Sequence, residues 1–304
     1  MTLGERRTSP SPAVLLVSHG TVDDLDDLRA FVTNVRRGRP PDAQLLSELR
    51  RRYEAIGGRS PLNEVNARVA VKVGDRLDVR TASANRLWNP YVRDVMRALA
   101  RDGVDAIAVV PLAQHSAHVY AEDARRAAAD AGVRVACAAD WGQSPELHDA
   151  FASRIRAVLG DPAATTVLLT AHSLPRVVVE RGDPYEREVQ ASAAAVGERL
   201  GPGVRAVVAF QSQGFGAPGE WLGPDLASAL DEAAARGDRR VVFAPIGFLA
   251  DHVEILYDLD VEAAAMARDR GMSSARVPSL NDDDDFIDVL VRIAQPLLDE
   301  LARA

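Results

Sequence analysis

Three carboxylates in the last fifth of the chain recur at every fourth residue: Glu254, Asp258 and Glu262. A helix that begins near Asp251 would align them along one face, because residues four apart are neighbours on a helix surface. Like charges at this spacing repel, so one interpretation is an exposed acidic stripe. The other is a line of oxygen ligands that conducts a hard divalent cation, or protons, into a cleft.

A histidine in the same half could complete this chemistry. His172 follows the apolar run 167–171 and precedes Ser173-Leu-Pro, so it is expected in a tight loop at the end of a strand. A lone histidine there could simply bond to the backbone. Together with nearby carboxylates, however, an imidazole can bind a transition metal or move protons near neutral pH.

The elements that must position these residues follow from apolar periodicity. Seven short, mostly β-branched runs predict strands, at 14–17, 79–83, 106–110, 133–138, 166–170, 206–210 and 241–244. Amphipathic segments between and after them predict helices, at 43–56, 63–77, 90–100, 146–159, 184–200, 226–235 and 286–301. Alternation of this kind predicts an α/β fold with parallel sheets.

The two halves of the chain resemble each other. The strand that ends at His19 aligns with the strand that ends at His172. A proline also precedes a histidine by seven residues in each half, Pro111 before His118 and Pro245 before His252; His115 and His118 are expected to be structural. These pairs predict two similar Rossmann-like halves, each a parallel sheet flanked by helices. Because ligands bind beyond the carboxyl ends of parallel strands, His19 and His172 should face one shared cleft.

The predicted boundaries are a disordered tail at 1–12, an N-terminal half at 13–160 and a C-terminal half at 161–304. The last helix could pack back on the first half.

Composition narrows the class of protein. The 304 residues are 47% hydrophobic and 26% charged, which is ordinary for a globular chain. The net charge of −8 does not favour binding of nucleic acid or of anionic lipid. No apolar run reaches the roughly 20 residues of a membrane span. A single cysteine cannot hold an iron–sulfur cluster. A cytoplasmic protein is therefore expected.

Several motifs of the chain match those of one known family. In the second half they are 170–175 (TAHSLP), 182–185 (GDPY), 210–212 (FQS), 219–225 (GEWLGPD), 245–248 (PIGF), 251–254 (DHVE) and 281–287. In the first half they are 36–40 (RRGRP) and 53–62 (YEAIGGRSPL). By these motifs the chain resembles the ferrochelatase family over about residues 13–303, and within it the short, soluble bacterial members that act on coproporphyrin III.

The resemblance implies a porphyrin cleft between the halves, into which ferrous iron is inserted as a substrate, with no permanently bound cofactor. It implies that His172 and Glu254 are catalytic and, with Asp258 and Glu262, contact the metal. It also implies that the porphyrin is bound by His19, Arg36, Arg37, Tyr53, Ser60, Tyr120 and Trp221. His19 stands where the soluble members commonly have tyrosine.

Two alternatives remain open. His19-Gly20 at the first strand tip is common in shorter chelatases, so another tetrapyrrole and metal, such as sirohydrochlorin and cobalt, could be the substrates. A non-catalytic haem or porphyrin carrier would be expected to lack His172 or the carboxylates, and both are present.

Overall fold

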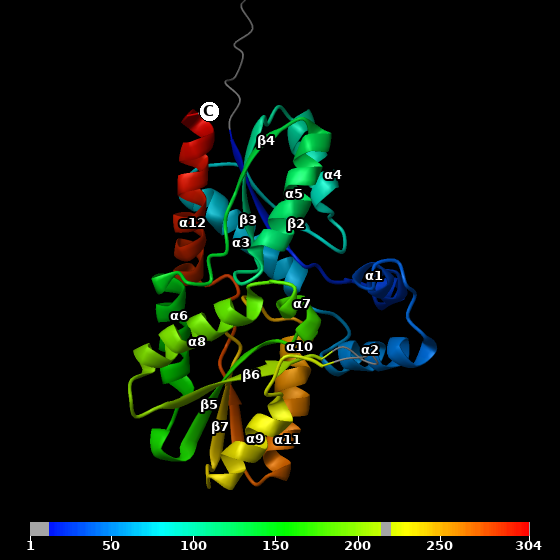
Figure 1. Ribbon diagram of the computed structural model, residues 1–304. Helices are drawn as coiled ribbons and strands as arrows, with labels where there is room; N and C mark the ends of the chain where they lie inside the picture. The colour runs from blue at the N-terminus through cyan, green and yellow to red at the C-terminus, as the bar shows by residue number, and fades with distance from the viewer. Residues whose placement is uncertain (1–11, 214–219, 304) are drawn as a thin grey trace, which may run out of the picture.

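Two lobes, each built around a four-stranded sheet, lie one above the other (Figure 1). The computed structural model describes residues 12–213 and 220–303. The predicted tail therefore lies outside the described residues except for Pro12, and so does Gly219 of the 219–225 motif.

Both sheets are wholly parallel and share one strand order. The first has the order β2-β1-β3-β4 and the second β6-β5-β7-β8. The strands are β1 (Ala13–Ser18), β2 (Thr81–Asn85), β3 (Ala106–Pro111), β4 (Arg134–Cys137), β5 (Thr165–His172), β6 (Arg205–Gln211), β7 (Arg240–Ala244) and β8 (Ser273–Arg276). The predicted fold class is confirmed, and each sheet has its switch point beside its central strand, β1 or β5.

Helices cover both faces of each sheet. In the first lobe and its connections they are α1 (Leu28–Val35), α2 (Ala43–Ala55), α3 (Leu62–Leu77), α4 (Val92–Arg101), α5 (Ala117–Ala131) and α6 (Pro145–Val158). In the rest of the chain they are α7 (Arg176–Glu180), α8 (Tyr185–Leu200), α9 (Leu226–Ala235), α10 (Val253–Leu256), α11 (Ala264–Asp269) and α12 (Asp284–Arg303). Short 3-10 turns lie at Leu25–Asp27 and Pro162–Ala164, and a π-helical turn, η3, at Asp258–Ala263.

All seven predicted strands are present, but the sequence did not reveal β8. Its residues, Ser-Ser-Ala-Arg, include one small apolar residue and no β-branched one, and none of them is buried. An edge strand pairs on one side only, so it does not need the continuous apolarity that marks β1.

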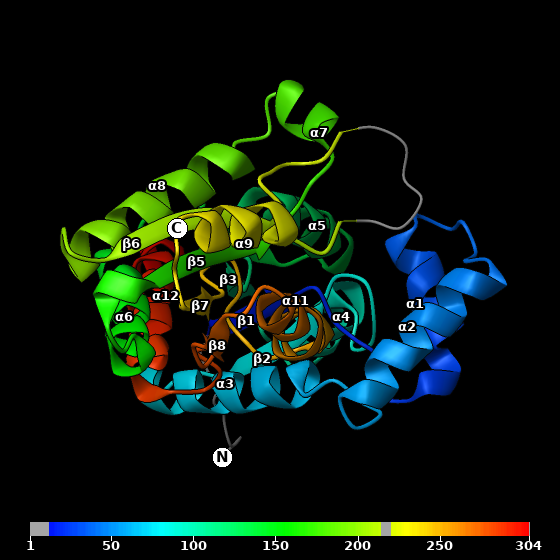
Figure 2. The ribbon, with the colours of Figure 1, turned by 90° about the horizontal axis from the view of Figure 1, so that it is seen from below.

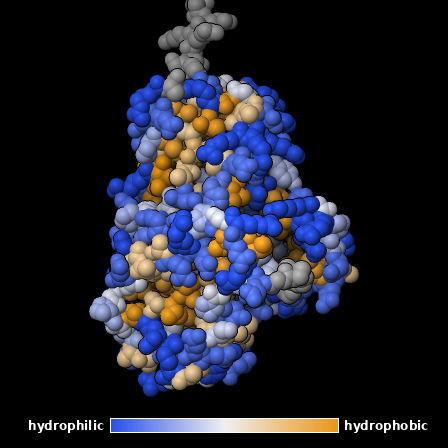
Figure 3. All heavy atoms as spheres, viewed as in Figure 1, coloured by the Kyte–Doolittle hydropathy of each residue, from blue (hydrophilic) through white to orange (hydrophobic). Residues whose placement is uncertain are grey.

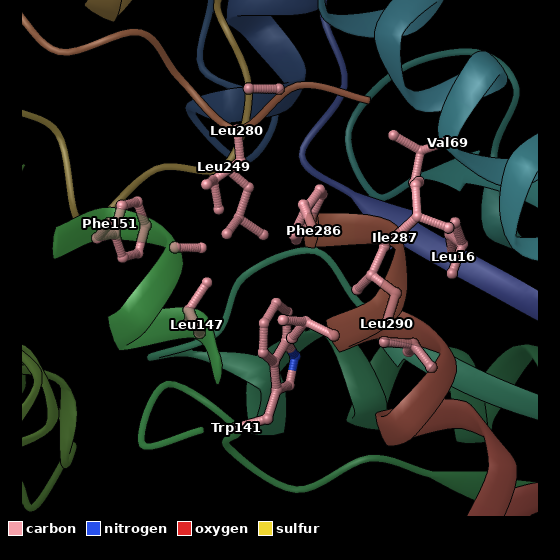
Figure 4. Close-up of a cluster of buried hydrophobic side chains, with 14 of the residues drawn as sticks. Leu16, Val69, Trp141, Leu147, Phe151, Leu249, Leu280, Phe286, Ile287 and Leu290 are labelled. Atoms are coloured by element: carbon pink, nitrogen blue, oxygen red, sulfur yellow. The ribbon is translucent and has the colours of Figure 1, made fainter. Parts of the chain in front are cut away.

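One hydrophobic cluster joins the lobes. It contains Leu16 of the first sheet and Leu169 of the second, and α12 contributes Phe286, Ile287 and Leu290 (Figure 4). The last helix lies along the first lobe, against β3, β4 and α3. The helix that precedes the second sheet, α6, packs against α8 of that lobe. This exchange makes the two lobes share a core, which resists their separation.

Charged contacts reinforce the packing of α12. Acidic side chains at and near its start face basic side chains of α3 and α6. Arg68 pairs with Asp282, Arg76 with Asp288, and Arg154 with Asp285. These acidic residues are therefore ion-paired within the molecule rather than simply solvated.

A helical hairpin of α1 and α2 projects from the side of the two lobes (Figure 2). Hydrophilic residues cover most of the face seen in Figure 3, and apolar residues reach the surface where the hairpin meets the lobes. Among the described residues, no helix combines the length and apolar character that a membrane span requires.

Candidate functional site

His172 and Glu254 face each other in the second lobe. His172 is the last residue of β5, and Glu254 lies in the first turn of α10, which follows β7. His172 Nε2 is 3.5 Å from Oε1 of Glu254. These two elements meet because β5 and β7 are paired neighbours, so their carboxyl ends lie at one edge of the sheet.

The charged forms of His172 and Glu254 attract each other electrostatically. Burial disfavours the charged form of each group, but their mutual attraction outweighs it. The pKa of His172 is therefore raised, and that of Glu254 is held well below its usual range. Yet 35% of the His172 side chain and 36% of the Glu254 side chain remain open to solvent. Both groups therefore remain accessible from solvent.

Two further histidines approach this pair. His252 precedes α10, and its Nε2 is 3.6 Å from the other carboxylate oxygen, Oε2 of Glu254. His19 follows β1 of the first lobe, where its ring lies edge-on to Phe31 at a centroid distance of 6.0 Å. Burial lowers the pKa of His19, opposed by a hydrogen bond to the Gly20 carbonyl and the nearby charge of Glu254. Strand tips of both lobes thus bring their histidines close to Glu254.

The segment that carries the carboxylates is not the regular helix expected from Asp251. Helix α10 begins at Val253 and ends at Leu256, and η3 follows as a π-helical turn in which Glu262 N–H donates to the carbonyl of Tyr257 at 3.0 Å. Single π-helical turns are rare and often occur at functional sites. A 3.6-residue periodicity cannot reveal this wider turn.

The carboxylates nevertheless lie on one side of the segment. Asp258 is 2.9 Å from Nη1 of Arg52, whose Nη2 is 4.0 Å from Glu262. The hydroxyl of Ser212 donates to the other oxygen of Asp258 at 2.5 Å. Burial, together with the charge of Glu254, raises the pKa of Asp258 to about 6 despite these partners. Asp258 can therefore change its protonation state near neutral pH.

Helix α2 is attached to the second lobe through the same segment. Arg51 donates to the Tyr257 hydroxyl at 2.7 Å, and the guanidiniums of Arg51 and Arg52 lie 5.2 and 4.9 Å from the Tyr257 ring centroid. Glu48 pairs with both arginines. The projecting hairpin is thus held against the carboxylate segment.

Four of the residues predicted to bind the porphyrin fall into two groups. Arg36 and Arg37 lie in the turn after α1, and Arg37 is exposed. Tyr53 and Ser60 are buried. The hydroxyl of Tyr53 lies 2.9 Å from Oγ1 of Thr21, and Ser60 accepts from a backbone N–H at the start of α3. Their polar groups support the loops around them, and their contact with porphyrin stays a prediction.

The last two predicted substrate residues lie on opposite lobes. Tyr120 is on α5, with the Arg86 guanidinium 5.7 Å from its ring centroid, and burial raises its pKa to about 12. Trp221 forms a bridge with Pro175, three residues beyond His172. Both residues are partly open to solvent.

Four contributors to the site were not predicted: His252, Arg52, Gln211 and Ser212. Gln211 donates to the Glu254 carbonyl at 2.7 Å, so the end of β6 holds the start of α10. His252 could have been suspected from its place two residues before Glu254. No sequence signal pairs Arg52 with Asp258, which is 206 residues away.

Within residues 12–213 and 220–303, no three His, Cys, Asp or Glu side chains converge closely enough to hold a metal ion.

The fold defines the class of protein. Over 95% of this chain and 96% of the other, the structure resembles that of SirB from Bacillus subtilis with Fe3+, with a TM-score of 0.60 and 16% identity. This likeness shows a chelatase-like architecture of two parallel sheets.

The sequence comparisons show the family. The profile described as Ferrochelatase matches residues 11–297. The chain is 34% identical to a ferrochelatase of Herpetosiphon aurantiacus over 93% of this chain and 97% of that protein. It is 31% identical to a coproporphyrin III ferrochelatase of Anoxybacillus flavithermus over 92% and 94%. The chain belongs to the ferrochelatase family and is a porphyrin metal chelatase, a lyase.

Proposed function

We propose that this enzyme inserts ferrous iron into coproporphyrin III at the His172–Glu254 pair, with release of two protons. The observation that carries the proposal is the 3.5 Å contact between these residues at the carboxyl edge of the second sheet, near His19 of the first lobe. Named relatives that act on coproporphyrin III support the choice of porphyrin. A cytoplasmic location stays a prediction.

The chemistry requires removal of the two pyrrole protons as iron enters. A flat porphyrin directs its nitrogen lone pairs into the ring plane, so a site that bends the ring exposes them to iron. The raised pKa of His172 suits it to accept one proton, and Glu254 stabilises the resulting imidazolium. The second proton would leave through the outer carboxylates, beginning with Asp258. On the first lobe, the lowered pKa of His19 keeps its imidazole neutral, the form that can bind iron.

The outer carboxylates are assigned to proton transfer. Asp258 has a pKa of about 6, so it can accept a proton and release it near neutral pH. Arg52 already neutralises part of its charge, which disfavours a second cation there. Glu262, with 41% of its side chain exposed, continues the line to solvent.

Basic residues at the edge of the proposed porphyrin site would select the porphyrin. Coproporphyrin III has four propionates and protoporphyrin IX has two. Arg36 and Arg37 lie on the projecting hairpin, where guanidinium groups can pair with carboxylates. We assign Tyr120 and Trp221 to contacts with the ring.

Anaerobic metallation assays test the proposal. Purified protein is given ferrous iron with coproporphyrin III or protoporphyrin IX, and metalloporphyrin formation is followed by absorbance. We expect faster turnover of coproporphyrin III and loss of most activity in His172→Ala and Glu254→Gln. Arg154→Ala, on the far charged interface with α12, is the matched control. Normal metallation by both site variants would refute the site assignment.

The competing function is insertion of cobalt into sirohydrochlorin. The observation in its favour is His19, an imidazole at the first strand tip in place of the tyrosine expected from the resemblance. Activity only with cobalt and sirohydrochlorin in the same assay would replace the proposal with this one.

A further inference from the structure

A histidine outside this centre, His118, lies between carboxylates of the two halves. Its Nδ1 is 3.2 Å from Asp140, in the loop after β4, and its Nε2 is 3.4 Å from Asp183, in the turn before α8. The backbone N–H of His118 donates to Asp140 at 3.3 Å. Because Ser116 does not cap α5 with its side chain, Asp140 supplies an acceptor that this helix start needs.

The internal repeat places His118 where the second half has His252. His252 lies beside Glu254, a carboxylate of its own half. His118 instead reaches Asp183, which belongs to the opposite half. The first-half histidine therefore forms a connection between the halves.

The turn that carries Asp183 leads to His172. Asp183 Oδ1 accepts from the backbone N–H of Tyr185 at 3.0 Å, and the Tyr185 hydroxyl donates to the backbone carbonyl of His172 at 2.9 Å. Tyr185 is buried, and its ring lies edge-on to His115 at a centroid distance of 6.4 Å. Two histidines of the first half thus contact the turn whose tyrosine supports His172.

We propose that His118 is a positioning residue for metal insertion: it holds the 183–185 turn against the first half and thereby fixes His172 opposite Glu254. This inference rests on the function proposed above. The His172 carbonyl belongs to the residue whose imidazole must meet the carboxylate, so loosening Tyr185 shifts the reacting group itself. A misplacement of about 1 Å can reduce a rate by roughly 100-fold, and partial loss of a support should cost about tenfold.

The test compares His118→Ala, Tyr185→Phe and the double variant with the wild type. Initial rates of ferrous-iron insertion are measured over a range of concentrations of the porphyrin that the wild type metallates. We expect kcat to fall about tenfold in each single variant, with KM for porphyrin within about twofold. The double variant should be no slower than the slower single variant, because both changes act through one connection. The matched control is Arg154→Ala, which removes ion pairs between α6 and α12 and should retain wild-type kcat.

A conservative variant separates positioning from general loss of structure. His118→Gln can retain one hydrogen bond and should recover part of kcat, and melting curves identify any variant that fails to fold. Wild-type kcat in His118→Ala and Tyr185→Phe, effects that multiply in the double variant, or no recovery in His118→Gln would overturn the inference. A wild-type protein that metallates no porphyrin would instead refute the proposed function.

Discussion

The two halves have the same strand order and a histidine at the tip of the central strand, yet the two histidines differ electrostatically. His172 faces a carboxylate at 3.5 Å, and its pKa is raised. His19 has an aromatic ring and a backbone carbonyl as neighbours, and burial lowers its pKa. In the proposed function, equivalent positions in a duplicated fold would provide one proton acceptor and one neutral ligand. The difference lies in the neighbouring side chains rather than in the strands.

The largest expected effect comes from removing either member of the His172–Glu254 pair, which distinguishes the second half from the first. His172→Ala or Glu254→Gln should lower kcat for iron insertion by about 100-fold or more, in the range of general acid–base catalysis. His19→Ala should lower it by about tenfold, because it removes a ligand and leaves the proton acceptor in place. Anaerobic initial rates measure both, with circular dichroism to verify folding. Equal losses in the two halves would contradict the division of roles.

The second prediction concerns the burial of His115, where the halves meet. Burial lowers its pKa to about 4, whereas an unfolded histidine titrates near 6.5. The unfolded chain therefore binds the extra proton first as the pH falls. Stability is complete above about pH 6.5 and decreases down to about pH 4, by up to about 3 kcal/mol, since each pKa unit corresponds to about 1.4 kcal/mol.

Denaturant unfolding at pH 7 and pH 4.5 measures this contribution. His115→Gln cannot be protonated, so its stability should fall less between the two pH values than that of the wild type. His148→Gln should also reduce the pH dependence, because burial lowers the pKa of His148 as well. An identical pH dependence of wild type and His115→Gln would show that His115 does not titrate as inferred.

A third prediction addresses the α1–α2 hairpin of the first half. Arg52→Ala leaves the buried Asp258 without its guanidinium partner, which should destabilise the protein by about 2 kcal/mol, less than a fully buried pair because Asp258 can protonate. It should also raise the pKa of Asp258 further. Chemical denaturation and carboxyl NMR titration are the measurements. Arg50→Ala, on the same helix but paired with the exposed Asp26, should change neither quantity.

The smallest effect is expected at the charged contact of α12 with the first lobe. Arg76→Ala removes an exposed pair with Asp288 and should cost less than about 1 kcal/mol, and salt should reduce the difference further. Melting at low and high ionic strength tests this. A loss of several kcal/mol would mean that these charges, rather than the shared hydrophobic core, hold the lobes together.

Much of the fold could be predicted because it depends on local apolar patterns. Strands such as β1 and β5 are buried along nearly their whole length and therefore read as continuous apolar runs. The repeated strand–histidine and proline–histidine patterns also indicated two similar halves. Strand β8 was not predicted, because this edge strand lacks an apolar run. The turn η3 was not predicted, because a π-helical turn departs from the 3.6-residue period.

The sequence by itself indicated the candidate groups for the chemistry: the histidine at the end of β5, the acid two residues after His252, and the outer carboxylates at their regular spacing. Only the tertiary structure decided which of these groups meet and in which protonation state. Asp258 is paired with Arg52 across 206 positions of the chain, and Tyr53 is buried, with its hydroxyl 2.9 Å from Oγ1 of Thr21. Burial and neighbouring charge depend on three-dimensional proximity, and residue type and spacing do not encode that proximity.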